Sequence, residues 1–395
     1  MTMTTNPQLD VDRIIDDRRI RIIVCCGSGG VGKTTTAAAI GLRAAERGRQ
    51  VCVLTVDPAR RLAQSMGLSS LDNTPRPVAG AAGENGGSLH AMMLDMKRTF
   101  DEIVEQHADP DRAAQILANP FYQSLSSSFA GTQEYMAMEK LGQLRHADEW
   151  DLIVVDTPPS RSALDFLDAP ERLGRFLDGR LIRLLTVPAR AGMSYMKVLN
   201  AGFSMMTSAL TKILGAQVLK DAQTFVSAFD TMFGGFRERA EWTYRLLQAP
   251  GTAFLVVAAP EPDALREASY FVERLDAERM PLAGLILNRV HVSPAARLSA
   301  ARSLAAAETL DMAAAETPDL RDGPDGSGPR YDLAAAVLRM HAERMNLGKR
   351  ERRLAEHFTS AHPAIPVAEV VAQPEDVHDL DGLRVIGTIL SQQSP

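Results

Sequence analysis

The chain has 395 residues, of which 45% are hydrophobic and 23% charged, and its formal net charge is −6. These values are ordinary for a globular protein, they leave room for one large α/β domain with an insertion, and the acidic balance disfavours a nucleic-acid binder. The three cysteines cannot form a disulfide framework, which favours a reducing, cytoplasmic setting, and no apolar run is long enough to span a bilayer.

Apolar segments alternate with helical patterns along the chain. Strands are predicted at residues 20–26, 51–56, 89–94, 152–155, 252–259, 282–287 and 365–371. The alanine-rich stretch from Thr34 to Arg47 predicts a helix directly after the first strand. Strands separated by helices form βαβ units, so the sequence predicts an α/β fold with a doubly wound, mostly parallel sheet.

Three stretches interrupt this alternation. Residues 73–88 are rich in Gly, Pro and Ala and predict a loop, and residues 318–331 carry the strongest disorder signal. Residues 166–250 are helical in pattern and predict an insertion subdomain. The predicted organisation is therefore a flexible N-terminus (1–18), a core in two parts (19–165 and 251–395), the helical insertion between them, and a flexible loop at 318–331.

A glycine-rich motif follows the first predicted strand and opens the first predicted helix. It fits G-x-x-x-x-G-K-[ST], a phosphate-binding loop, and comprises Gly27, Ser28, Gly29, Gly30, Val31, Gly32, Lys33 and Thr34, with Thr35 next to it. Glycines let backbone N–H groups surround phosphates, and the helix N-terminus adds partial positive charge. Lys33 is expected to reach the β- and γ-phosphates of ATP, and the Thr34 hydroxyl to ligate Mg²⁺.

Two aspartates close predicted strands. Asp57 follows the second strand, at the sheet edge where ligands bind, and is a candidate to position water for attack on the γ-phosphate. Asp156 ends the run Leu-Ile-Val-Val-Asp, which is the Walker-B pattern, and is expected to hold Mg²⁺. Thr34, Asp57 and Asp156 are thus the candidate metal residues.

The loop GxGGVGKTT, the DPA at 57–59 and the DTPP at 156–159 together resemble the ArsA-like ATPases, which include the arsenite-pump ATPase and the ATPase for guided entry of tail-anchored proteins. The segments at 260–262 (PEP), 287–289 (LNR) and 362–377 fit as well, so the resemblance covers nearly the whole chain. The set is most similar to an actinobacterial branch of anion-transporting ATPases.

The resemblance implies a role for each matching position. Asp57 matches the carboxylate that positions water, and residues 156–160 match the switch that senses the γ-phosphate. Asn288 matches the residue that reads the adenine edge, and the segment around Val371, Gln373 and Pro374 matches the wall of the adenine pocket. It also implies a dimer and, in the tail-anchor branch, a client groove in the insertion.

One departure concerns the phosphate loop. The family's loop carries a lysine that crosses the dimer interface to the partner's phosphates, and Ser28 occupies that position here. A hydroxyl supplies no such charge. We therefore expect a heterodimer with a paralogous subunit that keeps the lysine, in preference to a homodimer; the rival is substitution by Arg60, Arg61 or Arg161.

Cysteine chemistry also departs from the family. The chain has no C-x-x-C pair, so no structural zinc is expected. Cys25 and Cys26 are adjacent on a strand and point to opposite faces, which disfavours arsenite binding.

The segment 181–220 within the insertion has no acidic residue and includes Met193, Met196, Met205 and Met206. This composition is compatible with two arrangements. The segment forms a surface that binds an apolar helical client or an anionic membrane, or its helices pack on each other. Two functions therefore remain open: a dimeric, Mg²⁺-dependent ATPase that couples turnover to a helical client- or partner-binding domain, or a catalytically weak subunit that regulates a paralogous ATPase.

Overall fold

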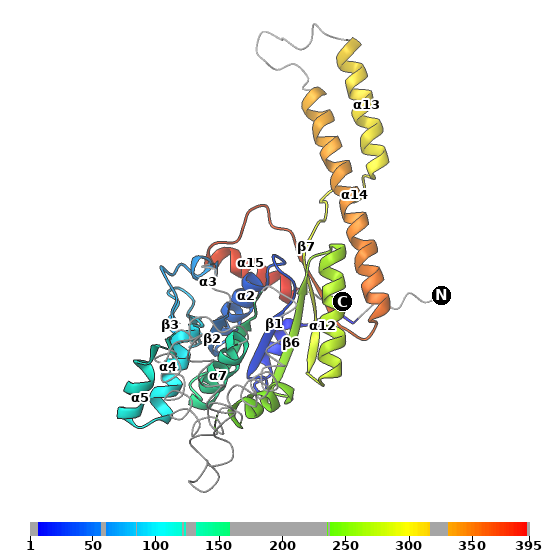
Figure 1. The fold of residues 1–395 in the computed structure, drawn as a ribbon. Coiled ribbons are helices and arrows are strands. Elements are labelled where there is room, and N and C mark those ends of the chain that lie inside the picture. The colour runs from blue at the N-terminus through cyan, green and yellow to red at the C-terminus, as the bar shows by residue number, and fades with distance from the viewer. Residues whose placement is uncertain are drawn as a thin grey trace, which may run out of the picture.

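The computed structural model describes residues 7–56, 61–83, 85–120, 122–123, 132–158, 235, 238–316 and 331–392. Within these residues a central sheet is covered by helices on both faces (Figure 1). The predicted α/β class is confirmed.

The sheet has eight strands in the order β3-β4-β2-β5-β1-β6-β7-β8. They are β1 (Ile22–Cys26), β2 (Gln50–Thr55), β3 (Arg76–Pro77), β4 (Ser88–Met93), β5 (Leu152–Asp156), β6 (Thr252–Ala258), β7 (Leu282–Val290) and β8 (Val367–Val371). Neighbouring strands are parallel, except that β3 pairs antiparallel with β4. The seven predicted strands are confirmed with small shifts at their ends, and β3 is a short addition inside the stretch predicted to be a loop.

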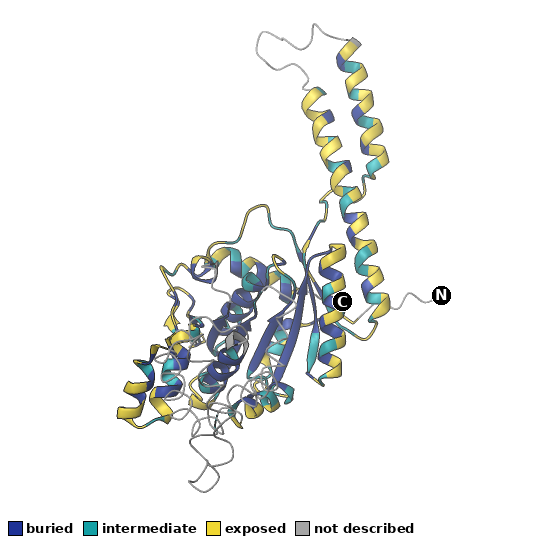
Figure 2. Ribbon diagram, viewed as in Figure 1, coloured by how far each residue is buried: buried dark blue, intermediate teal, exposed yellow. Residues whose placement is uncertain are grey.

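The two faces of the sheet form separate hydrophobic clusters because successive side chains of a strand point to opposite sides. One face is covered by α1 (Val11–Asp16), α2 (Lys33–Glu46), α3 (Arg61–Ser65) and α15 (Leu380–Ser391). The other is covered by α4 (Met96–His107), α5 (Pro110–Leu117), α7 (Thr132–Ala147) and α12 (Pro262–Ala277). Figure 2 shows the central strands between them as buried, and every residue of β1, β5 and β6 is buried, whereas the edge strands β3 and β8 are partly exposed.

The N-terminal segment differs from the prediction of a flexible 1–18. Residues 7–18 are ordered: Leu9, Val11 and Ile15 are buried, and the Leu9 N–H donates to the Val367 carbonyl. These apolar residues are scattered among charged ones, which hides the amphipathic pattern of α1 in the sequence.

A helical hairpin was not predicted at all. It consists of α13 (Ala300–Glu316) and α14 (Tyr331–Ala361), which lie side by side and project from the C-terminal end of β7 (Figure 1). The buried positions between the two helices are small, and they are Ser303, Ala307, Ala314, Ala335 and Ala342. No described helix combines the length and the apolar run that a bilayer span needs.

The predicted insertion is described only at its end. Residues 238–248 are helical and pack on α7, where Arg239 Nε donates to Glu139 Oε1 at 2.8 Å. The methionine-rich part of the insertion lies outside the described residues. So does the flexible loop predicted at 318–331, apart from Tyr331 at the start of α14.

Candidate nucleotide-binding site

The glycine-rich motif lies at the centre of the sheet. Residues 27–32 join β1 to α2, and β1 sits between β5 and β6, from which the strand order runs outward in both directions. Ligands of doubly wound sheets bind at such a reversal point, outside the carboxyl ends of the strands. The predicted phosphate loop therefore has the position that nucleotide binding requires.

Two positions of this loop require glycine because neighbouring atoms leave no space for a Cβ. A Cβ on Gly27 would lie 2.0 Å from the Val257 carbonyl oxygen, and one on Gly32 would lie 2.2 Å from Asn288 Nδ2. Both have positive φ, +151° and +92°. The loop backbone is thus pressed against β6 and β7, while its crest at 29–30 is exposed and open to a ligand.

Lys33 begins α2 and is buried, with 5% of its surface exposed. Its ammonium group donates to the Ser28 carbonyl oxygen at 2.7 Å. The charge is therefore held inside the loop, next to the helix N-terminus, where backbone N–H groups and the helix dipole also favour an anion.

Asp156, Thr34 and Thr55 meet beside the loop. Asp156 is fully buried at the end of β5, and its Oδ2 accepts from Thr34 Oγ1 at 2.8 Å and from Thr55 Oγ1 at 2.9 Å. A carboxylate and a hydroxyl are oxygen ligands of the kind Mg²⁺ prefers. Two of the three candidate metal residues are brought together.

Thr55 was missed by the sequence analysis. It ends β2 directly opposite Asp156 in the parallel register between β2 and β5. The sequence does show a polar residue at the end of an apolar strand. Its contact with Asp156 could not be predicted, however, because the order of the strands along the chain does not show that β2 and β5 are neighbours in the sheet.

The third candidate, Asp57, lies outside the described residues, as do Arg60, Ser160 and Arg161; of Arg61 only the backbone is described. The residue before Asp57 is placed: the Val56 N–H donates to the Asp156 carbonyl at 3.0 Å. Next to Asp156, the Thr157 hydroxyl donates to the Cys25 carbonyl at 2.9 Å.

Asn288, near the end of β7, contacts the phosphate loop. Its Nδ2 donates to the Val31 carbonyl at 2.8 Å, and its Oδ1 accepts from the Arg289 N–H. Arg289 has a positive φ of 62°, where the register between β7 and β8 shifts. The contact joins β7 to the loop; reading of an adenine edge by Asn288 stays a prediction.

The predicted adenine wall lies at the same edge of the sheet. Val371 ends β8, next to β7, and Gln373 Nε2 donates back to the Val371 carbonyl at 2.8 Å. Pro374 follows, exposed. The structure thus places Val371 at the end of β8, the strand next to β7 with Asn288, and Gln373 and Pro374 directly after that end.

The three cysteines are buried in the sheet, with Cys25 in one hydrophobic cluster and Cys26 and Cys52 in the other. The opposite orientation of Cys25 and Cys26 is confirmed. Burial raises the pKa of all three thiols, to about 12 for Cys26 and Cys52. Such thiols are poor nucleophiles and poor metal ligands.

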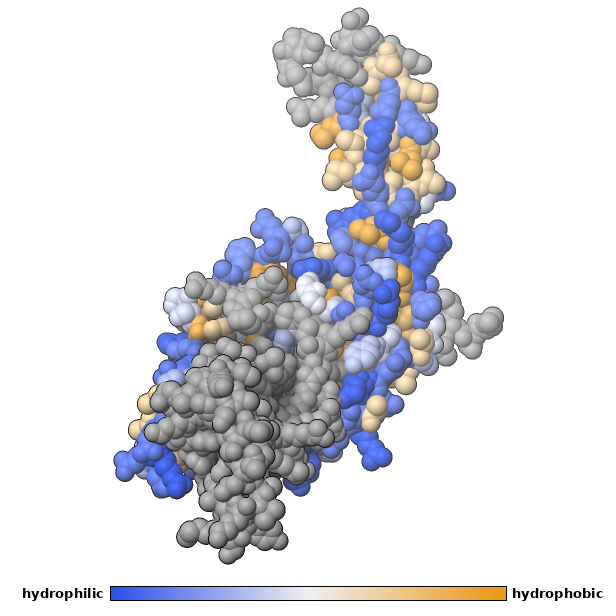
Figure 3. Space-filling model, viewed as in Figure 1, coloured by the Kyte–Doolittle hydropathy of each residue, from blue (hydrophilic) through white to orange (hydrophobic). Residues whose placement is uncertain are grey.

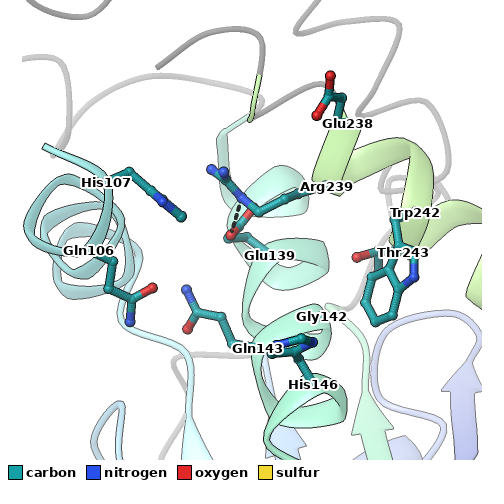
Figure 4. Close-up of a pocket in the computed structure, with 10 residues that line it drawn as sticks. All are labelled: Gln106, His107, Glu139, Gly142, Gln143, His146, Glu238, Arg239, Trp242 and Thr243. Carbon is teal, nitrogen blue, oxygen red and sulfur yellow. Dashed lines mark hydrogen bonds and ion pairs between the residues drawn. The ribbon is translucent and has the colours of Figure 1, made fainter. Parts of the chain in front are cut away.

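A pocket of about 440 Å³ lies elsewhere, between α4, α7 and the helix at 238–248. Figure 4 shows side chains from these three helices around it, with the Arg239–Glu139 ion pair on one side. None of its lining residues belongs to the phosphate loop, and burial lowers the pKa of His107 at its rim.

Comparisons with known proteins agree with the geometry of this site. The sequence model of the family described as "Anion-transporting ATPase" matches residues 20–311. Relatives include "ATPase GET3" of Malassezia globosa, 31% identical over 168 residues, which are 42% of this chain and 47% of that protein.

Longer alignments are found at lower identity. "ATPase get3" of Schizosaccharomyces pombe is 23% identical over 72% of this chain and 78% of its own, and "ATPase ARSA2" of Chlamydomonas reinhardtii is 24% identical over 72% of each. The chain spans about half the length of the Malassezia relative and of the "ATPase ASNA1 homolog" of Entamoeba histolytica, at 47% and 55%. With a family match over most of its length and a phosphate loop in the matching place, the chain belongs to the anion-transporting ATPase family.

Proposed function

We propose that the chain is a Mg²⁺-dependent ATPase that acts as a dimer and couples turnover to its helical insertion. The observation that supports Mg²⁺-dependent nucleotide binding is the hydrogen bond between the Thr34 hydroxyl and the buried Asp156, beside a loop in which Gly27 and Gly32 leave no room for a side chain. The names of the family and of the relatives add the expectation of ATP as substrate.

Each loop residue has a distinct task in this proposal. The backbone N–H groups of residues 27–34 and the Lys33 ammonium bind the phosphates. Thr34 and Asp156 supply oxygen ligands for Mg²⁺, which when bound neutralises phosphate charge. Asp57 comes directly after Val56, whose backbone N–H donates to the Asp156 carbonyl. In this proposal the Asp57 carboxylate orients a water toward the γ-phosphate.

Ser28 decides how active the chain is by itself. Because its side chain carries no charge, a dimer of two such chains lacks the lysine that the family places across the interface. The partner is then a second copy with slow turnover or, in our preferred version, a paralogue that supplies the lysine. The alternative function, a regulatory subunit with little hydrolysis of its own, rests on the same residue.

Coupling to the insertion has a structural basis at its described end. Arg239 on the helix at 238–248 is paired with Glu139 on α7, and Glu139 also accepts from the Tyr135 hydroxyl at 3.0 Å. Glu139 is 3% exposed and Arg239 28%, so the carboxylate is shielded from solvent while the guanidinium is partly exposed. We propose that motion of α7 during turnover reaches the insertion, and a client or membrane contact there, through this pair.

Binding and hydrolysis are measured separately to test the proposal, using a fluorescent ATP analogue and phosphate release. Asp57→Asn should bind ATP as the parent does and lose at least about 100-fold in turnover, because a water-positioning base is removed. Asp263→Asn, an exposed aspartate at the start of α12, is the matched control and should leave both unchanged.

A second variant separates the two functions. Ser28→Lys restores the missing cation and should accelerate turnover of a slow homodimer. Absence of ATP binding in the parent would refute the nucleotide function. Binding without hydrolysis, unchanged by Ser28→Lys, would replace the ATPase with the regulatory subunit.

A further inference from the structure

The pocket between α4, α7 and the helix at 238–248 takes no part in the proposed nucleotide chemistry. One face of α7 lies in its middle, through residues 139, 142, 143 and 146, which a helix places on the same side. The last turn of α4 forms one wall, and residues 238–243 form the other. Figure 4 shows Gln106, His107 and Gln143 directed into the space that these helices enclose.

The pocket has the size of a small-molecule site. Its volume is about 440 Å³. Sites of about 300–1,000 Å³ hold drug-sized ligands and combine apolar walls with a few well-placed polar groups. A single turn of an α-helix, about 10 Å across and about 5.4 Å long, already fills such a volume. The pocket therefore suits a molecule of two or three fused rings better than a helix of a protein partner.

Trp242 provides a flat aromatic wall. A Cβ on Gly142 of α7 would lie 2.8 Å from Thr243 Oγ1 and 3.6 Å from Cζ3 of the Trp242 ring. Glycine at this position therefore allows the indole ring to lie close against α7. Trp242 is 42% exposed, so part of its ring surface is accessible to a ligand. Aromatic side chains bind other flat rings by offset or edge-to-face stacking.

Gln143 provides a hydrogen-bond donor in the middle of the pocket. Its Nε2 is buried and has no hydrogen-bond partner among the residues that the structure describes, while its Oε1 accepts from Lys140 Nζ at 3.5 Å. A buried N–H group without an acceptor is unfavourable, so a ligand that places an acceptor here gains affinity. Figure 4 shows the Gln143 amide pointing away from α7, toward Gln106 and His107. A carbonyl oxygen or an unprotonated ring nitrogen is an acceptor of the required kind.

The charges around the pocket disfavour an anion. Of the ten lining residues in Figure 4, all of them described, the one arginine or lysine is Arg239, which donates to Glu139 Oε1 at 2.8 Å. A further carboxylate, Glu238, lies exposed at the edge. Burial and the nearby Arg239 charge lower the pKa of His107, which favours its neutral form at pH 7. A phosphate or carboxylate would therefore lose water here without gaining an arginine or lysine that lacks a partner.

We propose that this pocket binds an uncharged, flat aromatic molecule that carries a carbonyl oxygen or an unprotonated ring nitrogen. The rings of the ligand lie against Trp242, and its acceptor atom takes the hydrogen bond from Gln143 Nε2. None of the lining residues belongs to the phosphate loop, so occupation of the pocket does not require nucleotide. The inference therefore stands independently of the proposed function.

Binding of two fluorescent tricyclic probes to the full chain tests the hydrogen bond. Acridone has a carbonyl oxygen, and carbazole is a flat molecule of similar size without one. Fluorescence anisotropy should show saturable binding of acridone, at least about fivefold tighter than that of carbazole, because one hydrogen bond separates the two probes. Gln143→Met should abolish this preference and leave carbazole binding as in the parent. Gln115→Met, at an exposed glutamine on α5, is the matched control and should change neither dissociation constant.

A second pair of variants tests the aromatic wall. Trp242→Leu should weaken binding of both probes at least about fivefold, because the flat surface for stacking is lost. Tyr270→Leu, at an aromatic residue on α12 that is 47% exposed, is the matched control and should leave both unchanged. Figure 3 shows apolar surface on the projecting hairpin, where flat probes could also adhere. Met340→Gln, at an exposed position of this hairpin, should therefore leave the acridone dissociation constant unchanged.

Four results would overturn the proposal. They are a parent that binds neither probe, an acridone preference that survives Gln143→Met, tighter binding of anthracene carboxylate than of acridone, and displacement of acridone by ATP without any response to Trp242→Leu. The last result would place the probe in the nucleotide site. A parent that binds acridone with the expected response to both variants, but binds no ATP, supports the pocket and refutes the nucleotide function. A parent that binds ATP but not acridone overturns the pocket and leaves the proposed function standing.

Discussion

Thr55→Val removes one hydroxyl from the centre of the nucleotide site while keeping the side-chain volume. Thr55 is 1% exposed and donates to Asp156 Oδ2 at 2.9 Å, and Thr34 donates to the same oxygen. If Asp156 holds Mg²⁺ as proposed, Thr55 is the residue that orients this carboxylate from the neighbouring strand.

The magnitude follows from the charge of the acceptor. A hydrogen bond to an ionised group contributes about 1.5–3 kcal/mol to the free energy of unfolding, against about 1 kcal/mol for a neutral pair. Loss of a partner that orients a metal ligand lowers metal affinity by about 10- to 100-fold. Thr55→Val should therefore lower stability by about 2 kcal/mol and raise the Mg²⁺ concentration for half-maximal ATP binding at least about tenfold.

Mg²⁺ titrations of ATP-analogue binding, together with urea unfolding, measure both effects. Thr252→Val is the matched control, because Thr252 is equally buried and its hydroxyl donates to a neutral acceptor, the Leu246 carbonyl, at the opposite end of the sheet. It should cost about 1 kcal/mol and leave the Mg²⁺ dependence unchanged. Equal Mg²⁺ dependence in Thr55→Val and the parent would refute the role of Thr55 in orienting Asp156.

Three further predictions test other parts of the structure. Gly32→Ala should weaken ATP binding at least about tenfold, since its Cβ meets Asn288 at positive φ, whereas Gly30→Ala, with nothing within 4 Å, should bind more tightly than Gly32→Ala in the same titration. Arg49→Met should lower the free energy of urea unfolding by about 2–4 kcal/mol, because the buried guanidinium donates to three backbone carbonyl oxygens; a loss below about 1 kcal/mol would contradict this. The native thiols should not react with Ellman's reagent at pH 8, because their raised pKa keeps the thiolate unpopulated there, and three should react after unfolding; rapid reaction of the native chain would show that burial is wrong.

The strands were predictable because burial on both faces leaves a direct mark in the sequence. Runs such as residues 22–26 and 253–258 are apolar throughout, and the structure buries every residue in them. The order of these strands in the sheet was not predictable, since parallel pairing leaves no turn signal between neighbours. β5, far along the chain, lies between β1 and β2.

The hairpin was missed for a different reason. Between α13 and α14 the buried positions are mostly alanine, whereas Met312, Leu333 and Met340 are exposed. A pattern search looks for large apolar residues on the buried face, so this arrangement gives a weak and misplaced signal. The polar, glycine-rich stretch at 318–331 predicts a flexible loop and gives no sign of the helices on either side of it.

The sequence by itself determined the phosphate loop and the candidate roles of Lys33, Thr34 and Asp156, because a short glycine-rich loop between a strand and a helix carries its geometry locally. Only the tertiary structure decided that Thr55 joins Asp156 and that Asn288 closes on the loop, because both contacts depend on which strands become neighbours. The exposure of Leu333, Val337 and Met340 was likewise decided by packing: the face of α14 that carries them is covered where the helix crosses the core and uncovered where it extends past the core.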